Sequence, residues 1–182
     1  TDIYTSFAIL GGAKFDITVD TKTLTIQGGV LAPRNTPIRT AEAVPGNRVM
    51  SIPNQECPVE WWGALTTDTT NNHLFLDSAS RGCKHLILGE TSNAHGYFIN
   101  TSFSFNANVE FLEFRNSASL YADSGATVTF TDQELIAPFT GNILMDNGGT
   151  YAGTIINNPI SGHWRGAIGD GVAEDQDAIL DI

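Results

Sequence analysis

Hydrophobic and polar residues alternate over many short stretches of this chain. Residues 13–19 and 23–26 alternate with a period of two, and residues 30–33 form a short apolar run that ends at a proline. This pattern is typical of β-strands that bury one face, so we expect an all-β chain. Further strands, separated by Asn- and Gly-containing turns, are predicted at 48–52, 84–89, 96–99, 103–105, 109–114, 119–121 and 127–130.

One stretch is predicted to be helical. For residues 72–82, Asn71 or Asn72 lies at the expected N-cap and Gly82 lies near the expected C-terminus. We therefore expect a short helix here, followed at once by the strand at 84–89.

Three sequence landmarks occur twice in the same order. Chance rarely gives three ordered matches with nearly equal offsets, so we interpret them as an internal duplication. The matched pairs are 23–26 with 127–130, 31–33 with 136–138, and 61–64 with 164–167. The predicted organisation is a lead-in segment at 1–8, a first β-rich module at 9–80, connecting coils at 81–111 and a second β-rich module at 112–182.

The C-terminal stretch carries the most specific motif. It reads Trp-x-Gly-Ala-x-Gly-Asp-Gly from Trp164, followed by acidic residues and then by Ala178 and Ile179. Gly169 and Gly171 suit a tight turn around an aspartate, and acidic residues are favourable in the first turn of a helix.

This motif resembles the one that opens the β-helix of pectate-lyase-like right-handed β-helix proteins, a group that includes bacteriophage tailspikes and bacterial polysaccharide-degrading enzymes. The resemblance implies short right-handed parallel β-helix-like coils with small capping helices, in two tandem related modules, with the main β-helix beyond residue 182. Residues 66–68 lack the glycine turn, so the first copy need not open a full β-helix. We expect a structural role for Trp61, Gly63, Ala64, Trp164, Gly166, Ala167, Gly169, Asp170, Gly171, Asp175, Ala178 and Ile179.

The same resemblance implies a function. It points to the N-terminal attachment portion of a homotrimeric tailspike, bound to other virion tail or baseplate proteins, whose downstream β-helix binds and degrades a host surface polysaccharide. The missing initiator methionine and a helix that has barely begun at the last residue fit a piece of a longer protein. Two alternatives stay open: the N-terminal part of a secreted bacterial polysaccharide lyase or glycoside hydrolase, and a non-catalytic glycan-binding module. The expected location is the virion tail or, for a secreted enzyme, the bacterial exterior.

Composition narrows the partners. The formal net charge is −11 and the nine basic residues form no cluster, which argues against a nucleic-acid partner. No apolar run approaches the roughly 20 residues of a membrane-spanning helix, so we expect no membrane insertion. Two cysteines do not imply a disulfide framework, and we expect Cys57 and Cys83 to be buried free thiols.

The sequence shows no complete active site, and we predict no catalytic residue, metal or cofactor in this chain. The acids at 170–177 suit helix capping. Glu110 and Glu113 would lie on opposite faces of a regular strand and so would not form a catalytic pair. The four histidines lack metal-ligand spacing and are expected to be ordinary surface or turn residues: His73, His85, His95 and His163.

The three tryptophans recur at matching places. A buried tryptophan contributes a large apolar area, so we expect Trp61 and Trp164 to anchor the core. Trp62 aligns with Arg165, which favours an outward position. It is therefore the weak candidate for stacking against a sugar ring.

Overall fold

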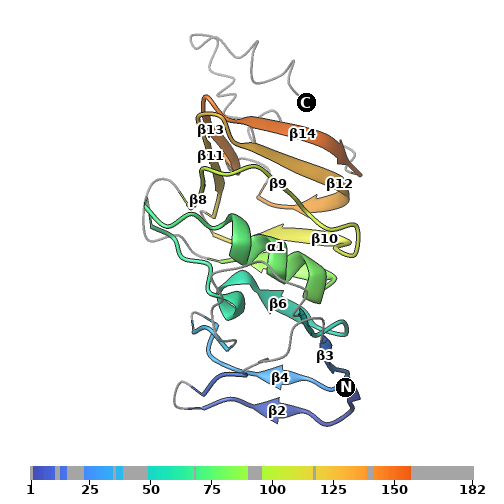
Figure 1. The fold of residues 1–182 in the computed structure, drawn as a ribbon. Coiled ribbons are helices and arrows are strands. Elements are labelled where there is room, and N and C mark those ends of the chain that lie inside the picture. Colours follow the sequence, from blue (N-terminus) through green and yellow to red (C-terminus); the bar gives the residue numbers. More distant parts are fainter. Residues whose placement is uncertain are drawn as a thin grey trace.

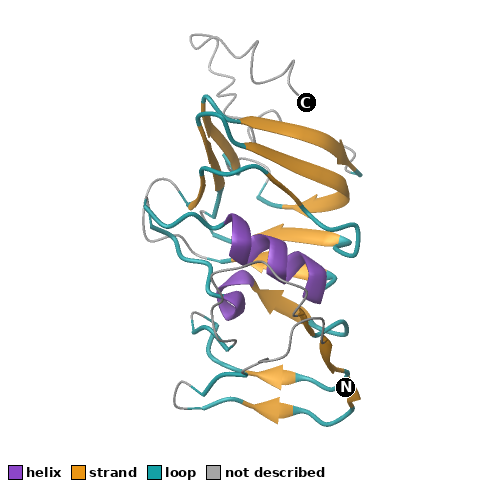
Figure 2. Ribbon diagram, viewed as in Figure 1, coloured by secondary structure: helices purple, strands orange, loops and turns teal. Residues whose placement is uncertain are grey.

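The protein forms a column of stacked coils, a parallel β-solenoid (Figure 1). Strands β2 and β4 lie at one end and β13 and β14 at the other, while Figure 2 shows helical segments only midway. The all-β class with few helices, predicted from the alternating pattern, is confirmed. This computed structural model describes residues 2–10, 13–15, 23–34, 36–38, 49–67, 69–89, 96–116, 118–138 and 142–156.

Most strands are short, and many lie within the predicted stretches, but the strands at 2–3, 7–8, 56–58, 144–147 and 150–155 were not predicted. The predicted strand at 127–130 continues to residue 136, and most of the one predicted at 13–19 lies outside the described residues. The elements are β1 (Asp2–Ile3), β2 (Phe7–Ala8), β3 (Thr23–Ile26), β4 (Val30–Leu31), β5 (Val49–Ser51), β6 (Glu56–Pro58), the 3-10 helix η1 (Val59–Trp62), α1 (His73–Gly82), β7 (His85–Leu88), β8 (Tyr97–Ile99), β9 (Phe103–Ser104), β10 (Phe111–Phe114), β11 (Leu120–Asp123), β12 (Thr127–Ile136), β13 (Leu144–Asn147) and β14 (Thr150–Ile155).

Each coil passes three faces of the column before it returns to the same face. Phe111 pairs with His85 of the preceding coil, and Leu120 likewise pairs with Tyr97. Face 1 holds β6, β7, β10 and the second half of β12, with β2 and β4 beneath them. Face 2 holds β8, β11 and β13. Face 3 holds β1, β3, β5, then α1, then β9, the first half of β12, and β14.

Strand β12 turns a corner of the column and belongs to two faces. Its pairing with β14 shifts register between Thr131 and Gln133, and Asp132 adopts a positive φ of 59°. Gln133 is fully buried, and its amide bonds the backbone oxygens of Thr131 and Val109 at 2.8 and 3.3 Å. A bulge of this kind lets one long strand bend and pair on both sides of the corner.

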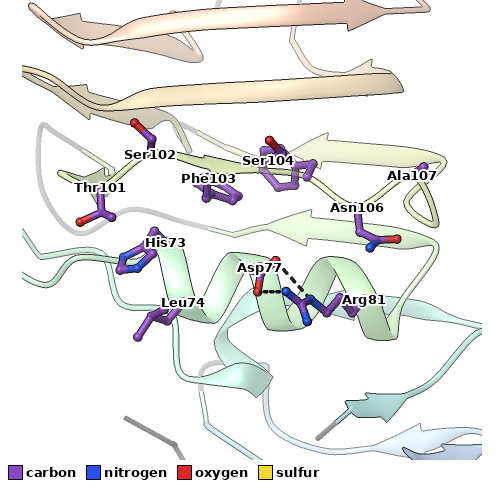
Figure 3. Close-up of a pocket in the computed structure, with 11 residues that line it drawn as sticks. His73, Leu74, Asp77, Arg81, Thr101, Ser102, Phe103, Ser104, Asn106 and Ala107 are labelled. Atoms are coloured by element: carbon purple, nitrogen blue, oxygen red, sulfur yellow. Dashed lines mark hydrogen bonds and ion pairs between the residues drawn. The ribbon is translucent and has the colours of Figure 1, made fainter. Parts of the chain in front are cut away.

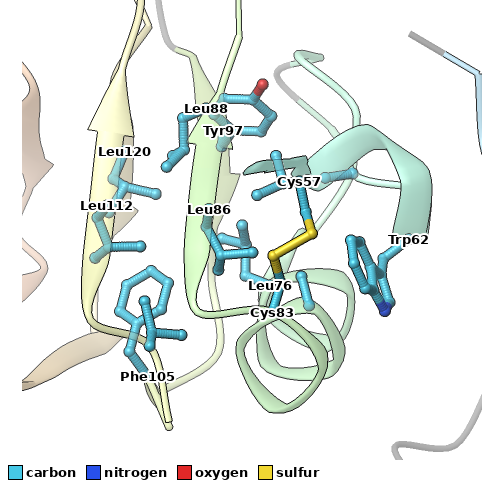
Figure 4. Packing of buried hydrophobic residues seen from close by; sticks show 14 of the residues in the cluster. Cys57, Trp62, Leu76, Cys83, Leu86, Leu88, Tyr97, Phe105, Leu112 and Leu120 are labelled. Atoms are coloured by element: carbon cyan, nitrogen blue, oxygen red, sulfur yellow. A yellow bond between two sulfur atoms is a disulfide. The ribbon is translucent and has the colours of Figure 1, made fainter. Parts of the chain in front are cut away.

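The interior consists of like residues stacked coil upon coil. Register places Leu86 over Cys57 and under Leu112, and Leu135 follows on the next coil. A second stack joins the rings of Phe105 and Phe130, whose centroids are 5.6 Å apart and nearly parallel. These apolar positions are buried (Figure 4). Burial of apolar residues against neighbours in the adjacent layers explains why such short strands are stable here.

Helix α1 replaces a strand on face 3. It spans His73–Gly82 with Asn72 at the N-cap, as the sequence predicted. The buried Asn72 side chain does not cap the helix; it accepts from the Leu65 N–H at 2.8 Å and donates to the Leu65 and Phe98 carbonyls at 2.9 and 3.2 Å. Asn72 therefore ties the chain before the helix to the next coil on face 2.

The cysteines form a disulfide, so the expectation of two free thiols is wrong. Cys57 on β6 and Cys83 after α1 are bonded, with their Cα atoms 6.4 Å apart and a sequence separation of 26. That separation is about one coil, which brings the two residues together on adjacent layers. A pair of cysteines alone carries no information about coil length, and for this reason the bond could not be predicted from their spacing.

The proposed duplication stays a prediction, because residues 157–182 lie outside the described residues. The landmarks that can be placed do occupy equivalent positions: residues 23–26 and 127–130 both lie on face 3, and Leu31 and Ile136 both lie on face 1. In a solenoid, residues separated by a whole number of coils return to the same face. The repeat of the solenoid can therefore explain the matched landmarks as well as an internal duplication can.

Candidate functional site

A groove runs along face 3 between α1 and the segment that contains β9 (Figure 3). Its volume is about 550 Å³, within the range of small-ligand sites, roughly 300–1,000 Å³. A helix is about 10–12 Å wide, whereas neighbouring strands lie about 4.8 Å apart, so β9 cannot pair with α1 as it would with a strand. One side is the helix stripe of His73, Asp77 and Arg81, with Leu74 beside it, and the other is residues 101–107.

Hydrogen bonds hold both ends of the groove. At one end the Asn71 amide donates to Thr101 Oγ1 at 2.9 Å, and Asn71 Oδ1 accepts from the Asn100 N–H at 3.3 Å. At the other end the buried Ser80 hydroxyl donates to the Asp77 carbonyl at 2.7 Å and accepts from the Asn106 N–H at 3.2 Å. The width of the groove is therefore set before any ligand arrives.

Between these two ends β9 presents an open backbone edge. The Phe105 N–H donates to the Thr129 carbonyl at 2.9 Å, so the peptide groups of Phe103 and Phe105 face β12. Alternate residues of a parallel strand direct their N–H and C=O to opposite edges. Those of Ser104 thus face α1, and no described residue hydrogen-bonds to them.

The helix side of the groove carries a fixed ion pair. Arg81 Nη2 lies 2.8 Å from Asp77 Oδ2, and Nε lies 3.2 Å from Oδ1, a two-point contact across one helical turn. The Arg81 side chain is 37% exposed and Asp77 is 18% exposed, so both remain reachable. Burial lowers the pKa of His73 at the end of the stripe, and the nearby Asp77 charge partly offsets this. His73 is therefore neutral at pH 7.

The opposite side offers an apolar ring and an amide. The half-buried Phe103 ring packs edge-on against Phe105, with centroids 4.9 Å apart. Asn106 is exposed, and its Oδ1 accepts from the Asn108 N–H at 2.9 Å, while its NH₂ group donates to no described residue. The groove therefore combines donors, acceptors and an apolar ring within one preformed surface.

A second polar cluster lies on face 1. His85 Nε2 is 2.9 Å from Glu113 Oε2, and Arg115 Nη2 lies 2.8 Å from Glu56 Oε2 and 2.9 Å from Glu113 Oε2. These residues come from β6, β7 and the end of β10, three successive layers. Hydrogen bonding from Arg115 is the main cause of the lowered pKa of Glu113, and the pair also raises the pKa of Arg115.

His85 was expected to be an ordinary surface or turn residue, but it lies on β7 beside two carboxylates. Ligand atoms of Glu56, His85 and Glu113 all lie within 4.8 Å of one another, a set that transition metals can accept. The Arg115 guanidinium already contacts both carboxylates, so the arrangement acts as an ion-pair ladder between coils. Glu110 faces another partner, Lys84 Nζ at 2.5 Å, and does not join Glu113.

A buried carboxyl group lies where face 2 meets η1. The Tyr97 hydroxyl donates to Glu60 Oε1 and accepts from the Gly89 N–H at 2.9 Å. Glu60 Oε2 is buried and accepts no hydrogen bond from the described residues. Burial raises the pKa of Glu60, against the lowering effect of the Tyr97 hydrogen bond and of Arg34. Burial likewise raises the pKa of Tyr97.

The first Trp-Trp-Gly-Ala motif lies in the core. Trp61 and Ala64 are buried, and Gly63 ends η1 in the left-handed conformation, φ 101°, where other residues are strained. Trp62 is 2% exposed, so the outward position expected for it is wrong, and it cannot stack against a sugar from solvent. Trp62 lies beside Gly82 of α1, a contact that the comparison with Arg165 could not reveal.

Several predicted site residues cannot be placed. His95 and His163 lie outside the described residues, as does the second copy of the motif: Trp164, Gly166, Ala167, Gly169, Asp170, Gly171, Asp175, Ala178 and Ile179. The groove and the face 1 cluster were missed from the sequence because their members lie far apart along the chain. A search at offsets of one coil length would have found His85 with Glu56 and Glu113.

Comparison with protein-family models, curated proteins and solved structures finds no match to this chain. The fold therefore defines the class of the protein: a β-solenoid, compatible with the β-helix superfamily. Within the described part of the chain, no helix has the length and apolar character needed to cross a membrane.

Proposed function

We propose that this chain is the N-terminal structural portion of a receptor-binding spike of the tailspike kind, with the polysaccharide-degrading β-helix downstream. The observation that carries the proposal is the stack of parallel coils, ordered layer upon layer from β1 to β14. Such a column suits a spacer, because each layer contacts its neighbours through backbone pairing and buried side chains. The Trp-x-Gly-Ala motif at residues 61–64 and 164–167 adds the resemblance to this group.

The side-chain chemistry fits a structural role. Glu110 and Glu113 have separate cationic partners, so residues 110–114 provide no free carboxylate pair for glycoside hydrolysis. In this proposal, the downstream region degrades the polysaccharide and the whole spike is a trimer. The N-terminal side attaches to virion tail or baseplate proteins.

The test is the intact mass of the natural protein together with its oligomeric state by light scattering. We expect a subunit much larger than 19.5 kDa that assembles as a trimer. A natural protein that ends at Ile182 and is monomeric would overturn the proposal.

The disulfide favours a second candidate, the N-terminal part of a secreted bacterial polysaccharide lyase or glycoside hydrolase. Disulfides persist mainly in oxidising compartments, and Cys57 and Cys83 are both fully buried. Two observations together distinguish the candidates. Mass spectrometry of the natural protein, alkylated before reduction, shows whether the two cysteines are bonded, and the gene sequence upstream shows whether a signal peptide is encoded. A bonded pair with a signal peptide upstream supports the secreted enzyme, whereas tail genes beside the coding sequence support the spike.

A further inference from the structure

We propose that the groove between α1 and β9 binds a neutral oligosaccharide. This site lies within the described chain and is separate from the downstream β-helix to which the proposed function assigns polysaccharide degradation. The proposal begins from the place on face 3 where the stack of strands is interrupted: a helix occupies the layer between β5 and β9. The interruption leaves a groove with an apolar lining and several polar groups where an uninterrupted sheet would have none.

The hydrogen-bonding groups of the groove match sugar hydroxyls. Each hydroxyl group both donates and accepts, so it needs donors and acceptors placed alternately. The groove offers the N–H and C=O of Ser104, the amide NH₂ of Asn106, and the Asp77–Arg81 pair, which presents acceptor and donor side by side (Figure 3). The exposed part of the Phe103 ring supplies an apolar surface for the C–H face of a sugar ring.

The charge balance favours a neutral sugar over an acidic one. Arg81 is the only cation among the described lining residues, and Asp77 already neutralises it through two contacts. His73 adds no positive charge, since burial lowers its pKa. The chain carries a formal net charge of −11, so a uronate would approach against the overall field.

An extended peptide fits the open edge less well. Addition of a strand requires a run of alternating N–H and C=O groups along the edge. Here Asn71 and Ser80 close the groove at both ends through Thr101 and Asn106, and Ser104 is the only residue of β9 whose backbone faces α1. One such residue is enough for a sugar hydroxyl but too few for a strand.

The groove is also rigid before binding. The hydrogen bonds of Asn71 and Ser80 fix the distance between the helix and the β9 segment, and the two-point contact fixes the Arg81 side chain. A ligand then loses its own freedom without ordering the protein, which favours affinity for a short sugar.

The test uses the full chain and an array of tetra- to hexasaccharides of glucose, galactose, mannose and rhamnose, with galacturonate oligomers as acidic probes. The best neutral oligosaccharide is then titrated by calorimetry against the wild type, Arg81→Gln and Asn106→Ala. We expect each substitution to weaken binding at least tenfold. The matched control is Lys84→Gln, which removes one paired surface cation outside the groove and should leave binding unchanged.

Thermal unfolding of each variant separates lost binding from lost folding. Selective binding of acidic oligomers, the absence of neutral binding at millimolar sugar, or equal affinities of Arg81→Gln and Lys84→Gln would each overturn the proposal. Capture of an extended peptide in the same groove, competing with the sugar, would also count against it. None of these results depends on the subunit mass or trimer measurement, so the spike proposal succeeds or fails separately.

Discussion

Successive coils contact one another differently on face 1 and on face 3. On face 1, β6 pairs directly with β7 and β7 with β10, and Arg115 joins Glu113 and Glu56 across the outside. On face 3, α1 stands between β5 and β9, and the open edge of β9 borders a groove. Repetition makes face 1 a continuous wall, while the interruption on face 3 creates a surface with free hydrogen-bonding groups.

Removal of the disulfide should change the free energy of unfolding most, because the bond connects β6 of face 1 to the end of α1 on face 3. We expect Cys57→Ser with Cys83→Ser to lower the free energy of unfolding by about 3 kcal/mol, since the bond closes a loop of about one coil. Urea unfolding measures this loss. Wild-type protein in reductant should match the double variant, and equal stability of the oxidised and reduced wild type would contradict the prediction.

The close packing of Gly82 in α1 against Met50 and Trp62 should have the second-largest effect on stability. A Cβ atom at Gly82 would lie 2.1 Å from the Met50 carbonyl oxygen and 3.0 Å from the Trp62 ring. Gly82→Ala should therefore cost about 2 kcal/mol by overpacking. The matched control is Gly29→Ala, whose nearest neighbour would be a side-chain atom of Gln55 at 3.5 Å. Thermal unfolding measures the melting temperature of each variant. If both variants lower it equally, α1 does not pack tightly against Met50 and Trp62.

The ladder on face 1 should have a smaller and pH-dependent effect. Glu113→Gln removes the charge that pairs with Arg115 and should cost about 1 kcal/mol at pH 7. The pKa of Glu113 is lowered from 4.5, chiefly by the Arg115 hydrogen bond. The stabilisation is therefore present above pH 4.5 and is lost as the pH falls through the lower folded value, where variant and wild type should converge.

A matched control for the ladder is Glu110→Gln. Glu110 also pairs with one cation, but its side chain is 52% exposed against 18% for Glu113. We expect a change near zero in urea unfolding, because solvent screens the exposed pair. If both variants lose the same stability, burial of the face 1 cluster has no energetic importance.

The smallest effect should come from Glu60, and its pH dependence has the opposite sign. Burial raises the pKa of Glu60 above 4.5, so the folded state holds its proton more tightly than the unfolded state. The wild type should lose stability as the pH rises from 4.5 through the folded value. Glu60→Gln should remove this trend and melt at a slightly higher temperature than the wild type at pH 7. A lower melting temperature for the variant at pH 7 would contradict this.

The local pattern predicted much of the fold. Period-two alternation indicated the strands around Leu24 and Leu112, because each buries one face against the core. The strand around Leu86 is a short apolar run, and Leu86, Ile87 and Leu88 are all buried. Asn72 and Gly82 marked the ends of α1, although the Asn72 side chain bonds Leu65 and Phe98 instead of capping the helix. The strand at 127–130 was predicted too short, since the bulge at Asp132 that continues it depends on contacts with Asn106 and Val109.

The candidate site was not predictable in the same way. The groove needs Asp77 on the helix and Ser104 about one coil later, and the face 1 cluster needs His85 beside Glu56 and Glu113. These residues are far apart in sequence, and only the register between coils decides which ones meet. Trp62 shows the same limit, because its burial depends on the close approach of Gly82.

The sequence by itself determined the β class, most strand positions and the one α-helix of the described chain, since these follow from patterns among residues a few positions apart. The tertiary structure decided the rest: the Cys57–Cys83 bond, the inward position of Trp62, the ion-pair ladder and the groove. The physical reason for this division is the length of each coil. This length, from one layer to the next, sets which side chains become neighbours, and no short-range pattern encodes it.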